Sequence, residues 1–171
     1  NKVVILDVTD KSNVLKVSEF DSSQIGYTHQ GWFTEDQRYF LLGDEEDELN
    51  FGINTRTLVF DFQDLDNPVQ TNTYLGPSSA IDHNGYVKGT DFFMASYRAG
   101  MRVLDISSIG ETNNQLTEIG YFDTYPANNG TGFNGAWSVY PYFASGNIII
   151  NDIERGLFVV RKSETLGNIE T

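Results

Sequence analysis

Four short runs of apolar residues, each ending in a polar turn, recur along the chain. The first three place an aspartate at the same point, as Asp7, Asp61 and Asp105, and the fourth places Arg161 there. The aspartates are 54 and 44 residues apart, a spacing typical of one β-propeller blade. The runs cover residues 2–8, 56–62, 100–106 and 156–161.

Further short strand patterns flank these runs. One follows each of the first three runs, and two precede each of the last three, bounded by turn-forming residues. No stretch keeps a period of 3.6 residues, so we expect almost no helix. The longest irregular stretch covers residues 43–55. The flanking strands are predicted at residues 14–20, 70–74 and 116–122, and at 29–34, 38–43, 80–88, 92–97, 135–140 and 147–152.

The order of these strands predicts an all-β fold. With the strands of a blade called A to D, the chain runs C-D, A-B-C-D, A-B-C-D, A-B-C. We therefore expect a β-propeller segment of about three four-stranded antiparallel blades, begun and ended in mid-blade, over residues 1–162. Residues 163–171 are expected to form a polar tail that frays, which leaves the last blade without its fourth strand.

An open propeller segment leaves strand edges exposed. Propellers close with 4–8 blades, and uncovered edges pair with other chains. We therefore expect the remaining blades of the ring, in the same or another chain, as the first partner of this segment.

Charge and composition narrow the functional classes. The chain has 171 residues, with 11 Lys and Arg against 24 Asp and Glu, a net charge of −13. Such an acidic surface repels phosphate backbones, so nucleic acid is excluded as a partner. The absence of cysteine excludes disulfides and thiolate metal sites. The chain contains no run of about 18 apolar residues, so no membrane span is predicted.

The two histidines of the chain occupy equivalent repeat positions. His29 and His83 lie 54 residues apart, and each opens strand A of its unit. Strand A is the innermost strand of a blade, so adjacent blades would bring both imidazoles towards one axis. Either these histidines hold neighbouring blades together by hydrogen bonds, or they bind a ligand or metal.

Acidic side chains gather where strand B ends. Alternate residues of a strand share a face, so carboxylates from these ends could converge with the imidazoles. Nitrogen and oxygen donors together suit a divalent cation, Ca²⁺ or Zn²⁺; the alternative is a solvated acidic loop. The candidate metal ligands are His29, His83, Asp44, Glu45, Glu46, Asp152 and Glu154.

Other polar and aromatic residues near the strand ends are candidates for ligand binding. The arginines could instead pair with carboxylates of neighbouring blades, and the tryptophans could pack between blades. The three repeated aspartates are expected to brace the turns that follow them. The candidate ligand-binding residues are His29, Trp32, Asp82, His83, Arg98, Trp137 and Arg155.

Several motifs resemble a known family. They include HQGWFTEDQR at residues 29–38, YRAGMRVLD at residues 97–105 and FNGAWSVYP at residues 133–141. Together they resemble the LVIVD-repeat proteins of the bacterial choice-of-anchor B family. The resemblance implies an exported bacterial protein, extracellular or attached to the cell surface, although this segment shows neither a signal nor an anchor. The family has no well-established activity that the resemblance could imply for this chain.

Three functions remain open. The first is a non-enzymatic, exported or cell-surface propeller that binds a ligand or partner, with or without a divalent cation. The second is a metal-dependent hydrolase at the propeller mouth, which requires His29 and His83 to lie within about 12 Å, given metal–nitrogen bonds near 2 Å. The third is a structural subunit of an extracellular assembly. The chain lacks a Gly-x-Ser-x-Gly elbow, a His-Glu-x-x-His motif and a Walker loop.

Overall fold

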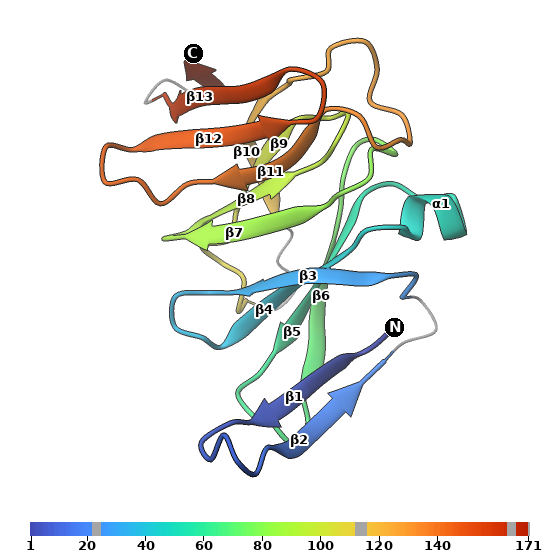
Figure 1. Cartoon of the computed structure of the whole chain (residues 1–171), viewed down its shortest axis with the longest axis vertical. Helices are drawn as coiled ribbons and strands as arrows, with labels where there is room; N and C mark the ends of the chain where they lie inside the picture. The colour runs from blue at the N-terminus through green and yellow to red at the C-terminus, as the bar shows by residue number, and fades with distance from the viewer. Residues whose placement is uncertain (22–24, 112–115, 164–166, 171) are drawn as a thin grey trace.

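The fold consists almost entirely of antiparallel strands stacked as successive sheets (Figure 1). The computed structural model describes residues 1–21, 25–111, 116–163 and 167–170. The predicted all-β propeller segment is confirmed. Within the described residues the one helix is α1 (Asp47–Phe51), which falls inside the stretch predicted to be irregular.

Each predicted unit forms its own set of consecutive antiparallel strands. The N-terminal hairpin pairs β1 with β2, and the three units that follow are called blade 1, blade 2 and blade 3. The hairpin contains β1 (Val3–Asp7) and β2 (Leu15–Phe20). Blade 1 contains β3 (Thr28–Phe33), β4 (Tyr39–Asp44), β5 (Arg56–Asp61) and β6 (Val69–Leu75). Blade 2 contains β7 (Asn84–Lys88), β8 (Asp91–Ala95), β9 (Met101–Asp105) and β10 (Thr117–Phe122). Blade 3 contains β11 (Ala136–Tyr140), β12 (Asn147–Asp152), β13 (Gly156–Lys162) and β14 (Gly167–Glu170).

The C-terminal tail departs from the prediction. Strand β14 pairs antiparallel with β13 and runs parallel to β10, which joins blades 2 and 3 into one eight-stranded sheet. The last blade therefore has a fourth strand, and the prediction that it lacks one is wrong. The segment has a single apolar residue, Ile169, so it shows no alternating pattern that would predict a strand. Residues 164–166 and 171 of the predicted tail lie outside the described residues.

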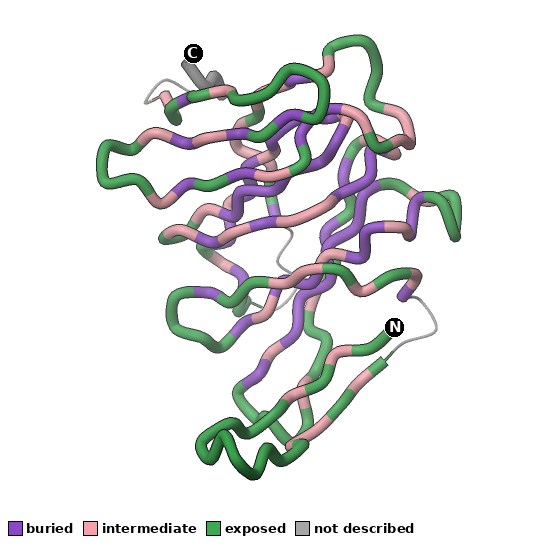
Figure 2. The backbone as a smooth tube through the Cα atoms, in the orientation of Figure 1, coloured by how far each residue is buried: buried purple, intermediate pink, exposed green. Residues whose placement is uncertain are grey.

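Apolar layers lie between successive sheets, and the inner parts of the strands are buried (Figure 2). Leu41 and Val59 of blade 1 pack with Phe92 and Leu104 of blade 2. Similar clusters join the hairpin to blade 1 and blade 2 to blade 3. Strands β5 and β9 are buried on both faces, which explains why their sequences are nearly continuous apolar runs rather than alternating ones.

The repeated aspartates brace the turns as predicted. The amides of Thr9, Gln63 and Ser107 each donate to the aspartate two residues before them, at 2.8–2.9 Å. Hydrogen bonds to these carboxylates lower the pKa of all three aspartates. The prediction of a structural role for Asp7, Asp61 and Asp105 is confirmed.

Side chains tie the innermost strands of adjacent blades together. Gln30 Nε2 donates to the Gly85 carbonyl at 2.9 Å, and the Gly85 amide donates to Gln30 Oε1 at 2.8 Å. One blade further on, Asn84 Nδ2 donates to the Trp137 carbonyl at 3.2 Å. These bonds hold β3 beside β7 and β7 beside β11, so the residues at their ends meet at one mouth of the segment.

Candidate functional site

Three chain segments bring His29, His83 and Glu45 together. His29 lies in β3 where the register with β4 shifts, and such bulges re-aim side chains. Glu45 follows directly after β4, and its amide donates to the Tyr27 carbonyl at 3.2 Å. His83 precedes β7 and is held by a hydrogen bond from its amide to the Ala95 carbonyl at 2.9 Å.

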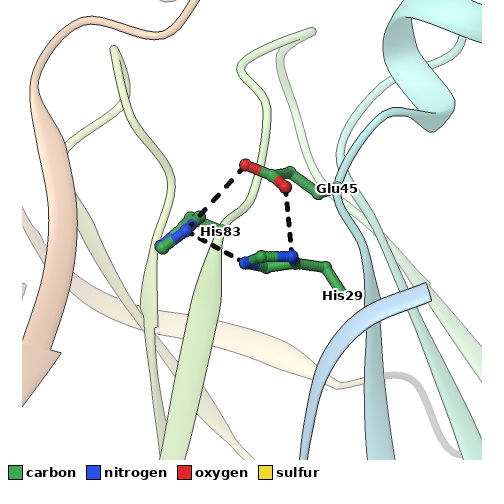
Figure 3. A group of neighbouring side chains, drawn as sticks. All are labelled: His29, Glu45 and His83. Atoms are coloured by element: carbon green, nitrogen blue, oxygen red, sulfur yellow. Dashed lines mark hydrogen bonds and ion pairs between the residues drawn. The ribbon is translucent and has the colours of Figure 1, made fainter. Parts of the chain in front are cut away.

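The three side chains form a compact triangle (Figure 3). The Nε2 atoms of His29 and His83 lie 3.0 Å apart. Glu45 Oε2 lies 3.3 Å from His29 Nδ1, and Glu45 Oε1 lies 3.9 Å from His83 Nε2. The side chains of His83 and Glu45 are 11% and 10% exposed, whereas that of His29 is 30% exposed. The group is therefore reached by solvent from the His29 side.

The two imidazoles meet through their Nε2 atoms. His83 Nδ1 contacts the Trp137 carbonyl, which accepts, and lies 3.0 Å from Asn84 Nδ2, which donates. His29 Nδ1 lies 3.3 Å from the Glu45 carboxylate. With both rings neutral and protonated at Nδ1, the two Nε2 lone pairs would face each other.

Aromatic residues surround the triangle. The Tyr97 hydroxyl donates to Glu45 Oε1 at 2.8 Å, and burial raises the pKa of Tyr97, so it keeps its proton. Trp137 stacks on His83 with ring centroids 5.4 Å apart, and Tyr27 stacks on His29 at 5.7 Å. Trp137 is 47% exposed and Tyr27 is 41% exposed, so both line the open side. Tyr27 and Tyr97 were not among the site residues predicted from the sequence. Their positions next to strand ends were the sequence feature that could have indicated them.

The donor set fits a small transition-metal ion. One donor atom from each of His29, Glu45 and His83 lies within 4.8 Å of the others. Ligands of a tetrahedral zinc ion, with bonds near 2.0–2.1 Å, are spaced about 3.3 Å apart, between the observed 3.0 and 3.9 Å. The other nitrogen of His83 contacts the Trp137 carbonyl, a partner outside the triangle of the kind that orients metal-binding histidines. Burial lowers the pKa of His83, which favours the neutral, metal-binding form.

The remaining predicted metal ligands lie elsewhere. Asp44 is fully buried and accepts from the Gly26 amide at 2.7 Å and from Arg56 at 3.1 Å. Asp152 accepts from the amide of Glu154 at 2.9 Å, and Glu154 accepts from the amide of Gly135 at 2.9 Å. These carboxylates satisfy local backbone amides, which is why they do not reach the imidazoles. Glu46 precedes α1 and makes no capping side-chain bond.

Four candidate ligand-binding residues lie away from the triangle of His29, Glu45 and His83. Arg98 donates to Asn134 and the Thr131 carbonyl, so it meets an amide and a backbone oxygen of blade 3 rather than the expected carboxylate. Arg155 is exposed in the turn between β12 and β13. Trp32, at the other end of β3, packs on Tyr86 of blade 2 and lines a cavity of about 540 Å³. The fourth is Asp82, described next.

Asp82 joins a second, fully buried acidic cluster with Asp47 and Glu48. Burial, reinforced by neighbouring carboxylates, raises the pKa of Asp82 well above its usual range and that of Glu48 to about 10. Burial also raises the pKa of Asp47, to about 6, against the opposing effect of Arg56. Asp82 therefore belongs to a different site from the two histidines.

Comparison with known proteins identifies the fold. No family model and no curated protein matches the chain. A solved structure of a Lactobacillus plantarum protein is similar with a TM-score of 0.72 and 15% identity, covering 96% of this chain and 50% of that one. A periplasmic gluconolactonase from Pseudomonas aeruginosa matches with a TM-score of 0.59 and 16% identity, over 86% of this chain and 46% of that one. A Bacteroides fragilis protein, provisionally described as a 6-phosphogluconolactonase, matches with a TM-score of 0.64 and 11% identity, over 90% and 42%.

These matches correct the family interpretation. The chain spans about half the length of the structures that it matches. The structures named here include lactonase-like proteins, and no family model supports an LVIVD-repeat or choice-of-anchor B protein, so the resemblance to that family is wrong. Part of the repeated pattern reflects blade geometry: in three of the four units an aspartate that ends strand C braces the turn after it. Within the described residues, no helix has the length and apolar character needed to cross a membrane.

Proposed function

We propose that this propeller segment binds a divalent transition-metal ion through His29, Glu45 and His83 and uses it to hold an oxygen-bearing small molecule. The observation that carries the proposal is the 3.0 Å separation of the Nε2 atoms of His29 and His83, with the Glu45 carboxylate beside them. Two lone pairs repel at this distance unless a positive charge lies between them. A metal ion or a proton supplies that charge, and the buried Glu45 carboxylate balances it.

The surroundings favour a metal ion with a free position. Three protein donors leave a fourth tetrahedral site for a water molecule or a ligand oxygen. The Tyr97 hydroxyl donates to Glu45 and fixes its carboxylate, as hydrogen-bond donors next to metal ligands do. The exposed rings of Trp137 and Tyr27 offer apolar walls against which a sugar-like ring could pack.

Zinc binding tests the proposal. We expect the metal-free chain to bind one Zn²⁺ per triangle by isothermal titration calorimetry, and H29F to lower the affinity on the order of 100-fold or more because it removes a ligand. The matched control is E46Q, whose carboxylate neighbours Glu45 but lies outside the triangle; it should bind zinc as the parent does. Equal affinity in the parent and H29F would exclude the site.

Hydrolysis of a lactone is the second candidate, and it builds on the same metal site. The specific observation in its favour is the donor set of two histidines and one glutamate, the set that some catalytic zinc sites use with an open fourth position. Zinc in such a site supplies a hydroxide-like nucleophile near neutral pH. The similar gluconolactonase suggests a sugar lactone as substrate. Water would add to the lactone carbonyl, the ring C–O bond would break, and a hydroxy acid would leave.

Ring opening of δ-gluconolactone separates the two candidates. If the segment is a hydrolase, the zinc-loaded chain releases acid above the spontaneous rate in a pH-stat, and H29F abolishes that excess. Y97F should lower kcat while zinc remains bound, because the mutation leaves the three ligands in place. Zinc binding without any acid release would leave the binding function and remove the hydrolase.

We also propose where the protein is located and how its ring of blades is completed. An extracytoplasmic location is supported by the periplasmic gluconolactonase among the similar structures. Completion of the ring by further blades, in the same or another chain, is supported by the coverage of only about half of those structures.

A further inference from the structure

The interior between blades 1 and 2 holds three carboxylates that face one another. Asp47 and Glu48 lie in α1, and Asp82 lies in the segment that leads from blade 1 into blade 2. Their exposed fractions are 0%, 4% and 2%. One oxygen from each lies within 4.8 Å of the others.

Several of these oxygens have no hydrogen-bond partner. Asp47 Oδ1, Asp82 Oδ1 and both carboxylate oxygens of Glu48 are buried and unpartnered. Buried polar atoms are almost always satisfied, and unpaired buried carboxylates are more costly than neutral groups. Either protons shared among the carboxyl groups or a bound cation would satisfy these oxygens.

The nearby cation is shared with a carboxylate outside the cluster. Arg56 donates through Nε to Asp47 Oδ2 at 2.8 Å and also reaches Asp44 Oδ2 at 3.1 Å. One guanidinium thus serves two carboxylates, of which only Asp47 belongs to the cluster. The fold also makes room for Asp82: a Cβ on Gly43 would lie 2.8 Å from Asp82 Oδ2.

We propose that Asp47, Glu48 and Asp82 bind a hard divalent cation, with Ca²⁺ preferred. Carboxylate oxygens are the ligands that Ca²⁺ favours, and its bonds of 2.3–2.6 Å allow ligands of one ion to be at most about 5 Å apart. The observed limit of 4.8 Å meets this condition. Zinc prefers nitrogen and sulfur donors, so the two sites differ in metal preference.

Such an ion would join blade 1 to blade 2. It would link α1, which follows β4, to the segment that precedes β7, behind the mouth where His29 and His83 meet. The inference does not rest on the imidazole site, because it shares no ligand with it.

Calcium-dependent thermal stability tests the inference. We expect Ca²⁺ at about 100 times its dissociation constant to raise the Tm of the chelator-treated chain by roughly 5–10 °C. The variants E48Q and D82N should each lose most of this rise. H29F, which removes a zinc ligand, should keep it, so failure of one site is distinguishable from failure of the other.

Two further variants keep the test decisive. E46Q removes the carboxylate next to Asp47 that lies outside the cluster, and it should respond to Ca²⁺ as the parent does. If D82N does not fold, G43A retains all three acids but presses on Asp82, and it should weaken Ca²⁺ binding at least several-fold. No Ca²⁺ response in the parent, or an equal response in E48Q, would overturn the inference. The cluster would then consist of carboxyl groups that share protons.

Discussion

Replacing Arg56 with methionine is expected to lower the free energy of unfolding by about 3–5 kcal/mol. Arg56 is 7% exposed and pairs with two carboxylates that are fully buried. Without the guanidinium, the buried carboxyl groups of Asp44 and Asp47 lose their ion-pair partner in an interior that cannot solvate a charge. Urea denaturation of R56M and the parent at neutral pH measures the difference.

The matched control is R38M, which removes the surface pair between Arg38 and Asp61. That pair has good geometry, with a contact of 2.7 Å, but its arginine side chain is 44% exposed. Solvent screens such a pair, so R38M should cost far less than R56M. Equal losses in the two variants would show that Arg56 does not neutralise a buried cluster.

The second large effect is expected when alanine replaces Gly85 or Gly31. A Cβ on Gly85 would lie 2.2 Å from the ring of Phe92, and a Cβ on Gly31 would lie 2.1 Å from the ring of Phe40. Each ring covers the glycine of the neighbouring strand, and adjoining β-strands cannot move apart to admit a methyl group. We expect each substitution to lower the free energy of unfolding by about 1–3 kcal/mol.

A double mutant checks this steric explanation. F92L shortens the side chain that occupies the space above Gly85, so part of the G85A cost should disappear in the F92L background. Additive losses in the double mutant would mean that the methyl group and the ring do not compete for the same space. The same comparison with F40L applies to Gly31.

The strands could be predicted from sequence because blade geometry repeats along the chain. Turn aspartates and apolar runs mark strand C, and the flanking alternation marks the other strands. Strand β14 could not be predicted in this way, because its sequence shows no alternating apolar pattern and its pairing with β13 and β10 joins distant parts of the chain. Helix α1 was likewise not predicted, and it lies inside the stretch that was expected to be irregular.

The candidate site was partly visible in the sequence. The equal repeat positions of His29 and His83 predicted their convergence, and they lie 3.0 Å apart. Choosing among the acidic residues needed three-dimensional information, because Asp44 faces Arg56 whereas Glu45, one residue on, faces the imidazoles. The alternation of side chains along a strand does not show which residue at the strand end or in the turn faces the imidazoles. The buried cluster of Asp47 and Glu48 with Asp82 arises from contacts between distant segments.

X-ray absorption at the zinc edge, on the chain loaded with one equivalent of Zn²⁺, tests the central claim most directly. The account predicts a four-coordinate ion with two imidazole nitrogens at about 2.0–2.1 Å and oxygen donors in the remaining positions. H29F should reduce the imidazole contribution. A shell made of oxygen alone, or a spectrum that H29F leaves unchanged, would contradict a metal site at His29, Glu45 and His83.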